Sequence, residues 1–261
     1  MCRILLGVNH PVDKKFLINF LSQSINKKNT PGIDNYLDND YHLDGYGFIY
    51  GNLYKKLNII KSPYSWFKEC NINKNLNTII KSKPKIIIGH LRYKGDNEGY
   101  PSIDNTHPFY YKDFIIVHNG KIKDFKCKRN EILKVIDNKY KKEIKGSTDT
   151  EFLFYLILTT IDLYLEYYKN KSYSKSDIYL LSFMTVFDYL IELDIKLVGN
   201  FIFSDSNNII IIRYIASNFK SAKEPLSLYF GHGYSSNDIV ISSEPLTTNY
   251  KIFPKNSYLI I

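Results

Sequence analysis

The chain has 261 residues, 44% of them hydrophobic and 23% charged, which is typical of a globular protein able to bury a sizeable core. The formal net charge is +9, but the lysines are spread along the whole chain and form no arginine-rich stripe or long basic block. Because a scattered basic surface does not concentrate the electrostatic field, we expect no nucleic-acid partner.

The cysteines and the apolar segments bear on the cellular compartment. Cys2, Cys70 and Cys127 form an odd set without CxxC spacing, which argues against a disulfide framework and for a reducing compartment. We expect no signal peptide, because the first apolar run is followed at once by proline and charges. The longest apolar segment, residues 152–168, is interrupted by polar residues and lacks the roughly 18 uninterrupted apolar residues of a membrane span. We therefore expect a cytoplasmic protein without a membrane segment.

Runs of apolar and β-branched residues predict strands, and apolar residues at helical spacing predict helices. In chain order, the predicted strands are residues 3–8, 46–51, 85–92, 113–119, 196–205, 208–215, 226–231, 238–243 and 257–261. The predicted helices are residues 12–25, 75–82, 130–137, 148–168 and 176–193. Two helix starts carry capping residues: Thr148 stands three residues before Glu151, in the pattern of a capping box, and Ser176 and Asp177 precede the last helix.

The order of these elements indicates the fold class. Strands dominate the first half, two long helices follow in succession, and strands then return. Such grouping is typical of largely antiparallel sheets with helices packed on them, an α+β layered sandwich rather than a doubly wound parallel sheet. No repeat or long linker divides the sequence, so we predict a single domain over residues 1–261.

The opening stretch MCRILLGV contains the first candidate for chemistry. If Met1 is removed, Cys2 carries a thiol and a free α-amine on one residue, which places a nucleophile beside a weak base. Taken alone, the cysteine is explained equally well as a packing residue. A second candidate is Arg92 in GHLRYKG, where an apolar strand ends at His90 and Arg92. A guanidinium there would bind a substrate carboxylate through two parallel hydrogen bonds, although an ordinary surface arginine is the simpler interpretation.

Two further stretches contain polar groups at the ends of predicted elements. In VHNGKI, the Asn119–Gly120 pair is typical of a tight hairpin, but the Asn119 amide and the Gly120 N–H could also converge on one oxygen as an oxyanion hole. In GSTDTE, the acidic residues fit a helix start, and Asp149 could alternatively bind a substrate ammonium. The stretch ISSEPLT is interpreted as a strand entering a proline turn.

Glycines and histidines provide weaker signals. DGYGFIYGN lacks the lysine and the following helix of a phosphate loop, so we interpret it as a strand packed closely at Gly45 and Gly47. None of the histidines has HxH or HExxH spacing, and no carboxylate is suitably placed among them, so we expect no metal site. They are His10, His42, His90, His107, His118 and His232.

Taken together and in this order, the motifs MCR, DGYG, GHLRY, NTHPF…HNG and STDTE resemble those of class II glutamine amidotransferases, a family of the N-terminal-nucleophile hydrolase superfamily. SSEPL points more narrowly to the stand-alone type, which includes the ergothioneine-pathway γ-glutamyl hydrolase and the small subunit of the yeast glutathione-degrading peptidase. The matches run from residue 1 to about residue 247. Each motif is weak alone, but six in family order form a specific signal.

This resemblance implies a four-layer αββα sandwich of two mainly antiparallel sheets with helices on both outer faces. It also implies hydrolysis of a γ-glutamyl amide, with Cys2 as the nucleophile after loss of Met1 and its α-amine as the base. Asn119 and Gly120 would hold the oxyanion, Arg92 the α-carboxylate and Asp149 the α-ammonium, and a γ-glutamyl thioester would form. No cofactor is implied. The substrate would be a small γ-glutamyl compound, and a separate ammonia-accepting or peptidase subunit is a possible partner.

One departure from the family leaves an alternative open. After the arginine–aromatic pair the family often has Ala followed by Ser or Thr, whereas this chain has Lys94 and Gly95. The change could shift specificity towards a larger γ-glutamyl compound, or it could mark a catalytically silent subunit that binds a partner or a γ-glutamyl ligand. A metal-dependent hydrolase is the third and least favoured hypothesis.

Overall fold

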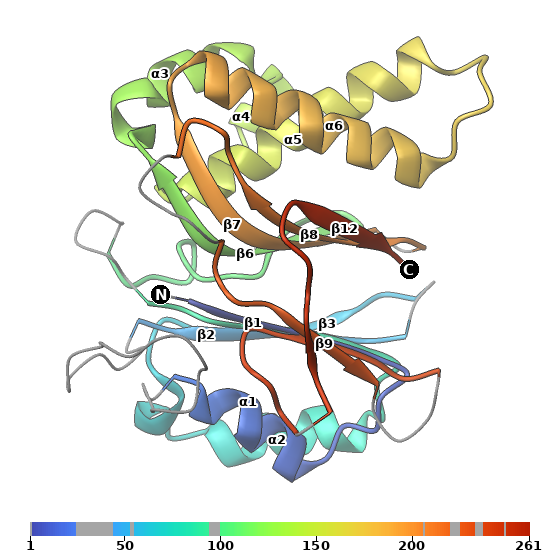
Figure 1. The fold of residues 1–261 in the computed structure, drawn as a ribbon. Helices are drawn as coiled ribbons and strands as arrows, with labels where there is room; N and C mark the ends of the chain where they lie inside the picture. The colour runs from blue at the N-terminus through green and yellow to red at the C-terminus, as the bar shows by residue number, and fades with distance from the viewer. Residues whose placement is uncertain are drawn as a thin grey trace.

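Two β-sheets lie face to face at the centre of the protein, and helices cover the outer face of each sheet (Figure 1). This computed structural model describes residues 2–24, 44–52, 55–93, 100–205, 207–219, 225–232, 237–247 and 249–261. Within these residues every strand pairing is antiparallel. The layers run helix, sheet, sheet, helix, which confirms the predicted α+β four-layer sandwich.

The first sheet has seven strands in the order β11-β9-β10-β1-β4-β2-β3, so the N-terminal strand is central. Its strands are β1 (Arg3–Val8), β2 (Tyr46–Gly51), β3 (Asn58–Ser62), β4 (Ile86–Leu91), β9 (Tyr229–His232), β10 (Ile239–Ser242) and β11 (Lys251–Ile252). The outer face is covered by α1 (Lys14–Ser22) and α2 (Ile72–Lys81), and a short 3-10 helix, η1 (Trp66–Lys68), precedes α2.

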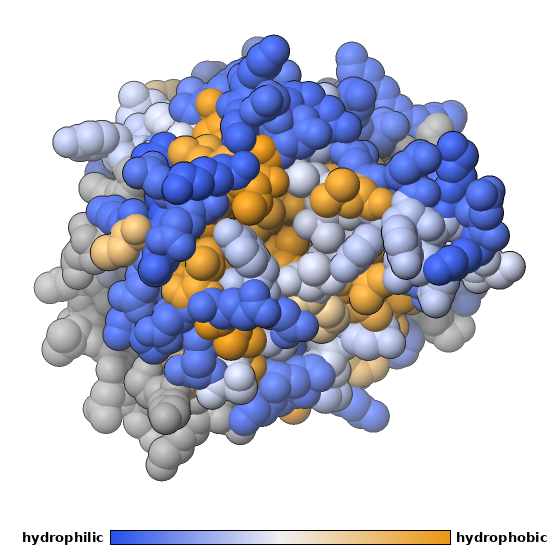
Figure 2. Space-filling view, turned by 90° about the horizontal axis from the view of Figure 1, so that it is seen from above, coloured by the Kyte–Doolittle hydropathy of each residue, from blue (hydrophilic) through white to orange (hydrophobic). Residues whose placement is uncertain are grey.

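The second sheet has five strands in the order β12-β8-β7-β6-β5. Its strands are β5 (Phe109–Tyr111), β6 (Phe114–Lys123), β7 (Lys196–Ser204), β8 (Ile209–Ile215) and β12 (Ser257–Ile260). Its outer face is covered by α3 (Phe125–Val135), α4 (Asn138–Lys141), α5 (Asp149–Tyr167) and α6 (Lys175–Glu192). Seen from this side, the helical face is largely hydrophilic, with hydrophobic residues gathered near its centre (Figure 2). No helix among the residues described is long and apolar enough to cross a membrane.

The layered arrangement explains why the central strands are apolar on both faces. Strands β1 and β4 are buried along their whole lengths, because one face packs on the other sheet and the opposite face packs on α1 and α2. Between the sheets, Ile4 and Leu6 of β1 share one core cluster with Val117 of β6 and Ile211 of β8. The successive apolar residues of RILLGV and IIIGHL therefore reflect burial on two faces.

All predicted strands and helices are present, but five short elements were not predicted. These are β3, β5, β11, η1 and α4. β3 is an edge strand whose first residues are exposed, and β5, β11 and α4 have only three, two and four residues, so they carry little hydrophobic pattern. The N-cap of α6 is Ser174, two residues before the predicted Ser176. The Ser174 hydroxyl and the Asp177 carboxylate form a capping box.

The predicted close packing at the glycines of DGYGFIYGN is confirmed. A Cβ atom on Gly47 would collide with the carbonyl oxygen of His107, and Gly45 has φ +125°, in the left-handed region that favours glycine. Strand β2 therefore lies against the backbone that leads into β5. This contact brings the segment around His107 close to the central strands of the first sheet.

Arg213 of β8 joins the second sheet to segments that belong with the first. Its side chain is buried and donates hydrogen bonds to the carbonyl oxygens of Pro225 (3.0 Å), Leu226 (3.0 Å) and Phe253 (2.6 Å). Residues 225–228 lead into β9, and Phe253 lies between β11 and β12. The guanidinium thus satisfies three buried backbone acceptors where the chain passes between the two sheets.

We predict that Arg213→Met lowers the free energy of unfolding by about 3 kcal/mol or more, because the methionine removes three hydrogen bonds and leaves the carbonyl oxygens of Pro225 and Phe253 without the guanidinium donor; Leu226 keeps a bond from Asn200. Urea unfolding followed by circular dichroism measures this change. Lys123→Met, which also removes a cation from a strand but at an exposed position, serves as the control. Equal midpoints for the two variants would contradict the interpretation.

Candidate active site

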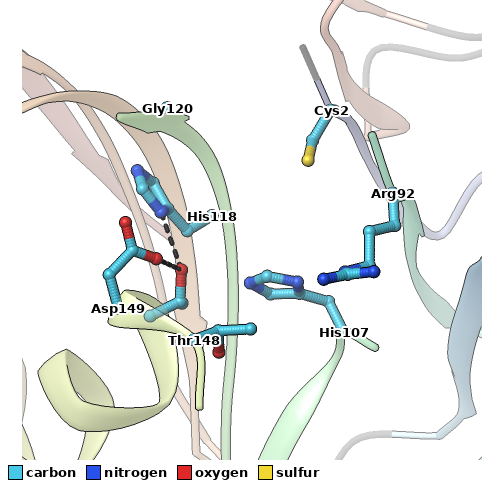
Figure 3. Close-up of a pocket in the computed structure, with 8 residues that line it drawn as sticks. Cys2, Arg92, His107, His118, Gly120, Thr148 and Asp149 are labelled. Carbon is cyan, nitrogen blue, oxygen red and sulfur yellow. Dashed lines mark hydrogen bonds between the residues drawn. The ribbon is translucent and has the colours of Figure 1, made fainter. Parts of the chain in front are cut away.

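A pocket lies where the ends of β1, β4 and β6 meet the start of α5 (Figure 3). It therefore collects side chains from both sheets and from the helical layer. The residues that line it are Cys2, Arg92, His107, His118, Gly120, Thr148, Asp149 and Thr150. Four of the five residues predicted from the sequence are among them, and Asn119 lies beside the pocket instead.

Cys2 is held at the pocket by the backbone of the neighbouring strand. It directly precedes β1, and the backbone N–H of Tyr93 donates to its Sγ at 3.4 Å. The thiol in turn contacts the carbonyl oxygen of Tyr93 at 3.6 Å. The residue is partly exposed, and its sulfur points into the pocket (Figure 3). Met1 lies outside the described residues.

Arg92 follows β4 directly and forms the opposite wall from Asp149 (Figure 3). Its backbone N–H donates to the carbonyl oxygen of Gly45 at 2.8 Å, and its guanidinium donates to the carbonyl oxygen of Asp44 at 3.4 Å. The side chain is almost fully buried. A guanidinium fixed in this way presents a planar set of donors that suits a carboxylate.

Asp149 is the first residue of α5 and is tied to the neighbouring polar groups. The Thr150 hydroxyl donates to its Oδ1 at 3.1 Å, and His118 Nδ1 lies 2.9 Å from the same hydroxyl oxygen. Burial raises the pKa of Asp149 to about 6, although the hydrogen bonds from Thr150 and the charge of Arg92 favour the carboxylate. Because a hydroxyl has one hydrogen, His118 is the donor to Thr150 whenever Thr150 donates to Asp149.

The loop before α5 is held by two polar side chains. Glu151 accepts hydrogen bonds from the backbone N–H groups of Lys145 (2.9 Å) and Gly146 (2.8 Å), and Asn105 accepts one from Ser147 N–H (2.8 Å). The predicted N-cap is confirmed, since the Thr148 hydroxyl accepts from the Glu151 N–H at 3.4 Å. In a capping box the Glu151 carboxylate would also accept a bond from the backbone N–H of Thr148. Here it accepts bonds from the Lys145 and Gly146 N–H groups of the loop instead. These contacts fix the position of Asp149.

Three buried histidines lie beside the pocket and pack as aromatic rings. His90 stacks on His107 with ring centroids 4.0 Å apart, and His118 stacks on Phe201 at 4.4 Å. Burial lowers the pKa of His90 and His107 well below the usual range and lowers that of His118 to about 3. All three are therefore neutral near pH 7. The part of the chain that the structure describes contains no group of three or more possible metal ligands; His42 lies outside it.

Asn119 and Gly120 differ in their relation to the pocket. Gly120 lines it, and a side chain at this position would collide with the ring of His118 and the backbone of β7. The buried Asn119 amide instead donates from Nδ2 to the hydroxyl of Ser243 at 3.3 Å. Lys94 and Gly95, the departure from the family pattern, lie outside the described residues.

Four pocket residues were not assigned to the site from the sequence, although one of them, Thr148, was predicted as a helix cap. They are His107, His118, Thr148 and Thr150. Each of them lies inside one of the motifs NTHPF, HNG and STDTE, so the motifs already indicated the segments that line the pocket. A single histidine or threonine does not indicate by itself which way its side chain points. The packing of β6 against α5 brings His118 and the two threonines to the pocket, and the contact of His107 with β2 brings the other histidine there.

The four-layer αββα sandwich of two antiparallel sheets is the fold of the N-terminal-nucleophile hydrolases, and Cys2 directly precedes one of its central strands. The class II glutamine amidotransferase family matches residues 1–251, and the chain belongs to this family of enzymes, which act on C–N amide bonds. The probable glutamine amidotransferase DUG3 of Saccharomyces cerevisiae is 29% identical over 222 residues, which cover 72% of this chain and 60% of the yeast protein.

Other similar proteins share shorter segments or the fold alone. The isomerizing glutamine–fructose-6-phosphate aminotransferase of Francisella tularensis is 36% identical over 90 residues, 34% of this chain and 14% of that protein. A glutamine aminotransferase class-II domain protein from Silicibacter pomeroyi has a TM-score of 0.64 at 17% identity, covering 100% of this chain and 94% of that one. The glutamine phosphoribosylpyrophosphate amidotransferase of B. subtilis has a TM-score of 0.60 at 17% identity, and the match covers 100% of this chain and 47% of that one.

We predict that Asp149→Asn stabilises the protein more at pH 7 than at pH 4. The raised pKa means that the folded state binds more protons than the unfolded state between about pH 4 and pH 6, so the free energy of unfolding falls as the pH rises through this window. Asparagine removes this penalty, and the gain should be about 1–2 kcal/mol larger at pH 7. Thermal unfolding at both pH values measures it, with Asp113→Asn on the exposed β5–β6 turn as control. A gain that does not change with pH would be inconsistent with a buried carboxylate.

Proposed function

We propose that the protein hydrolyses the γ-glutamyl amide bond of glutamine or of a related γ-glutamyl compound. The observation that carries the proposal is the placing of the Cys2 thiol at a pocket whose opposite walls carry the cation of Arg92 and the carboxylate of Asp149. The glutamyl group has a carboxylate and an ammonium on its α-carbon and a carbonyl further along its side chain. These three groups complement the three protein groups in charge and in chemistry.

The two opposite walls of the pocket would each bind one charged group of the substrate. The Arg92 guanidinium would bind the α-carboxylate through two parallel hydrogen bonds. The Asp149 carboxylate would bind the α-ammonium, and this cation would in turn favour the charged form of Asp149. Because both partners are held by the protein before substrate arrives, little ordering is required on binding.

The chemistry would begin once Met1 is removed. The α-amine of Cys2 takes the thiol proton, and the sulfur attacks the γ-carbonyl carbon to form a tetrahedral oxyanion. When this intermediate collapses, the C–N bond breaks, the leaving amine receives the proton, and a γ-glutamyl thioester remains. Water then attacks the thioester and transfers a proton to the α-amine. Glutamate and the free thiol are released.

Neutral donors would stabilise the oxyanion. The backbone N–H of Gly120 belongs to a pocket-lining residue, and the Asn119 amide lies next to it on the same strand. The neutral histidines around the pocket add no positive charge that would compete with Arg92 for the substrate carboxylate. Arg92 and Asp149 would therefore set the orientation of the substrate, and the two donors would act on the developing charge.

We expect Cys2→Ala to reduce glutamate release from glutamine, glutathione and other γ-glutamyl amides by about 10⁴-fold or more, because no other group takes over as nucleophile. A screen of these compounds with wild-type protein identifies the substrate. Cys127→Ala, which removes an exposed thiol, should retain full activity. Mass spectrometry of the purified N-terminus establishes that Met1 is absent from the active protein. Undiminished turnover by Cys2→Ala would refute the mechanism, and an inactive wild type that still binds γ-glutamyl compounds would favour a silent subunit.

The role of Asp149 can be tested with a substrate that lacks the α-ammonium. We expect the wild-type protein to prefer glutamine to glutaramate by about 10- to 100-fold in kcat/KM, since the deamino compound leaves a buried carboxylate without its cation. Asp149→Asn should lose most of this preference. In the wild type, KM for glutamine should also rise as the pH falls below about 6, where Asp149 becomes protonated. A preference that persists in Asp149→Asn would place the ammonium elsewhere.

A further inference from the structure

Ser243, the first residue after β10, connects the two strands that carry the proposed nucleophile and oxyanion donors. It belongs to the stretch SSEPL and is almost fully buried. Its Oγ accepts a hydrogen bond from the backbone N–H of Ile4 at 2.9 Å and another from Asn119 Nδ2 at 3.3 Å. One hydroxyl thus contacts β1, two residues after Cys2, and β6, one residue before Gly120.

The backbone around Ser243 reinforces this connection. The Ser243 N–H donates to the carbonyl oxygen of Ile4 at 3.1 Å. The next residue, Glu244, forms an ion pair with Arg3 at 2.7 Å, and Arg3 also donates to the carbonyl oxygen of Cys2 at 3.2 Å. The turn after β10 therefore contacts Arg3 and Ile4 directly and Cys2 through the Arg3 side chain, so Ser243 has a fixed position relative to Cys2.

Two polar groups at the Ser243–Asn119 contact complement each other. Among the described residues, Asn119 Oδ1 is buried without a hydrogen-bond partner, which is unfavourable for a polar atom. The Ser243 hydroxyl accepts two bonds, and its own hydrogen remains available to donate. A half turn of the Asn119 amide brings Oδ1 to this hydrogen and directs both hydrogens of the NH2 group away from Ser243. The hydroxyl can therefore anchor the amide by its oxygen and leave the nitrogen free for another acceptor.

We propose that Ser243 is a positioning residue for the oxyanion donor: it donates to Asn119 Oδ1 in the reacting state and so directs the Asn119 NH2 group to the γ-carbonyl oxygen. This inference rests on the proposed amide hydrolysis. Ser243 does not contact the substrate, and its effect passes through Asn119. Since the oxyanion forms only as the thiol attacks, Ser243 contributes to kcat and leaves the binding of the glutamyl group unchanged.

The test is a double-mutant cycle between Ser243 and Asn119, followed by steady-state kinetics with the substrate found in the screen. Ser243→Ala should lower kcat by about 10- to 100-fold with KM within about twofold of wild type. In an Asn119→Ala background the same change should cost less than about twofold, because the group it positions is absent. Ser243→Cys replaces the hydroxyl by a somewhat larger thiol, which is only a weak donor and acceptor, and it repeats the test if Ser243→Ala unfolds.

Ser242→Ala is a matched control, since this buried serine bonds Gln23 on the side of α1 at 3.0 Å and should retain wild-type kcat. Equal losses of kcat from Ser243→Ala with and without Asn119, or a kcat for Ser243→Ala equal to that of Ser242→Ala, would overturn the positioning role. Failure of the proposed function has a different signature. In that case Cys2→Ala would turn over substrate like the wild type, and both proposals would fall.

Discussion

The register of β1 between β4 and β10 is the constraint on which the pocket depends. Arg3 lies opposite Leu91, so the next residue outward on each strand is Cys2 on one and Arg92 on the other. A slip of one residue would turn every side chain of β1 to the opposite face, and it would move the thiol away from the arginine at the same time. The buried apolar residues on both faces of β1 and β4 oppose such a slip. The core therefore fixes the distance between the nucleophile and the cation.

The polar site lies at the strand ends because the apolar residues between the two sheets do not extend that far. Between the sheets, Ile4 and Val117 belong to an apolar cluster, whereas at the pocket end the same strands continue into Cys2 and Gly120. The helical layer supplies the remaining wall, because Asp149 begins α5. A carboxylate at that position is costly to bury, and its raised pKa reflects this cost. The protein thus keeps a carboxylate at a position where burial makes its charged form less favourable than in water.

The sequence was sufficient to predict the elements that carry strong periodicity and the motifs that carry chemistry. The apolar runs of β1 and β4 and the long segment of α5 have unambiguous patterns, and the family motifs assigned Cys2, Arg92, Gly120 and Asp149 to one site, where the fold indeed places them. Contacts between distant segments could not be predicted in this way. The bond between Asn119 and Ser243 spans 124 residues, and it depends on which neighbour each strand pairs with. Likewise, Thr148 and Glu151 have the spacing of an ordinary capping box, and this spacing does not indicate that the Glu151 carboxylate bonds to Lys145 and Gly146 instead.

The central position of β1 has a consequence for synthesis. Its partners β4 and β10 end at residues 91 and 242, so β1 completes its pairing only after residue 242 has been synthesised. Until then one edge of β1 lacks its partner strand. Once β10 pairs, the turn at Ser243 and Glu244 closes over the start of β1. The topology therefore allows Cys2 to meet Arg92 and Tyr93 through β4 before the turn after β10 connects β1 to β6.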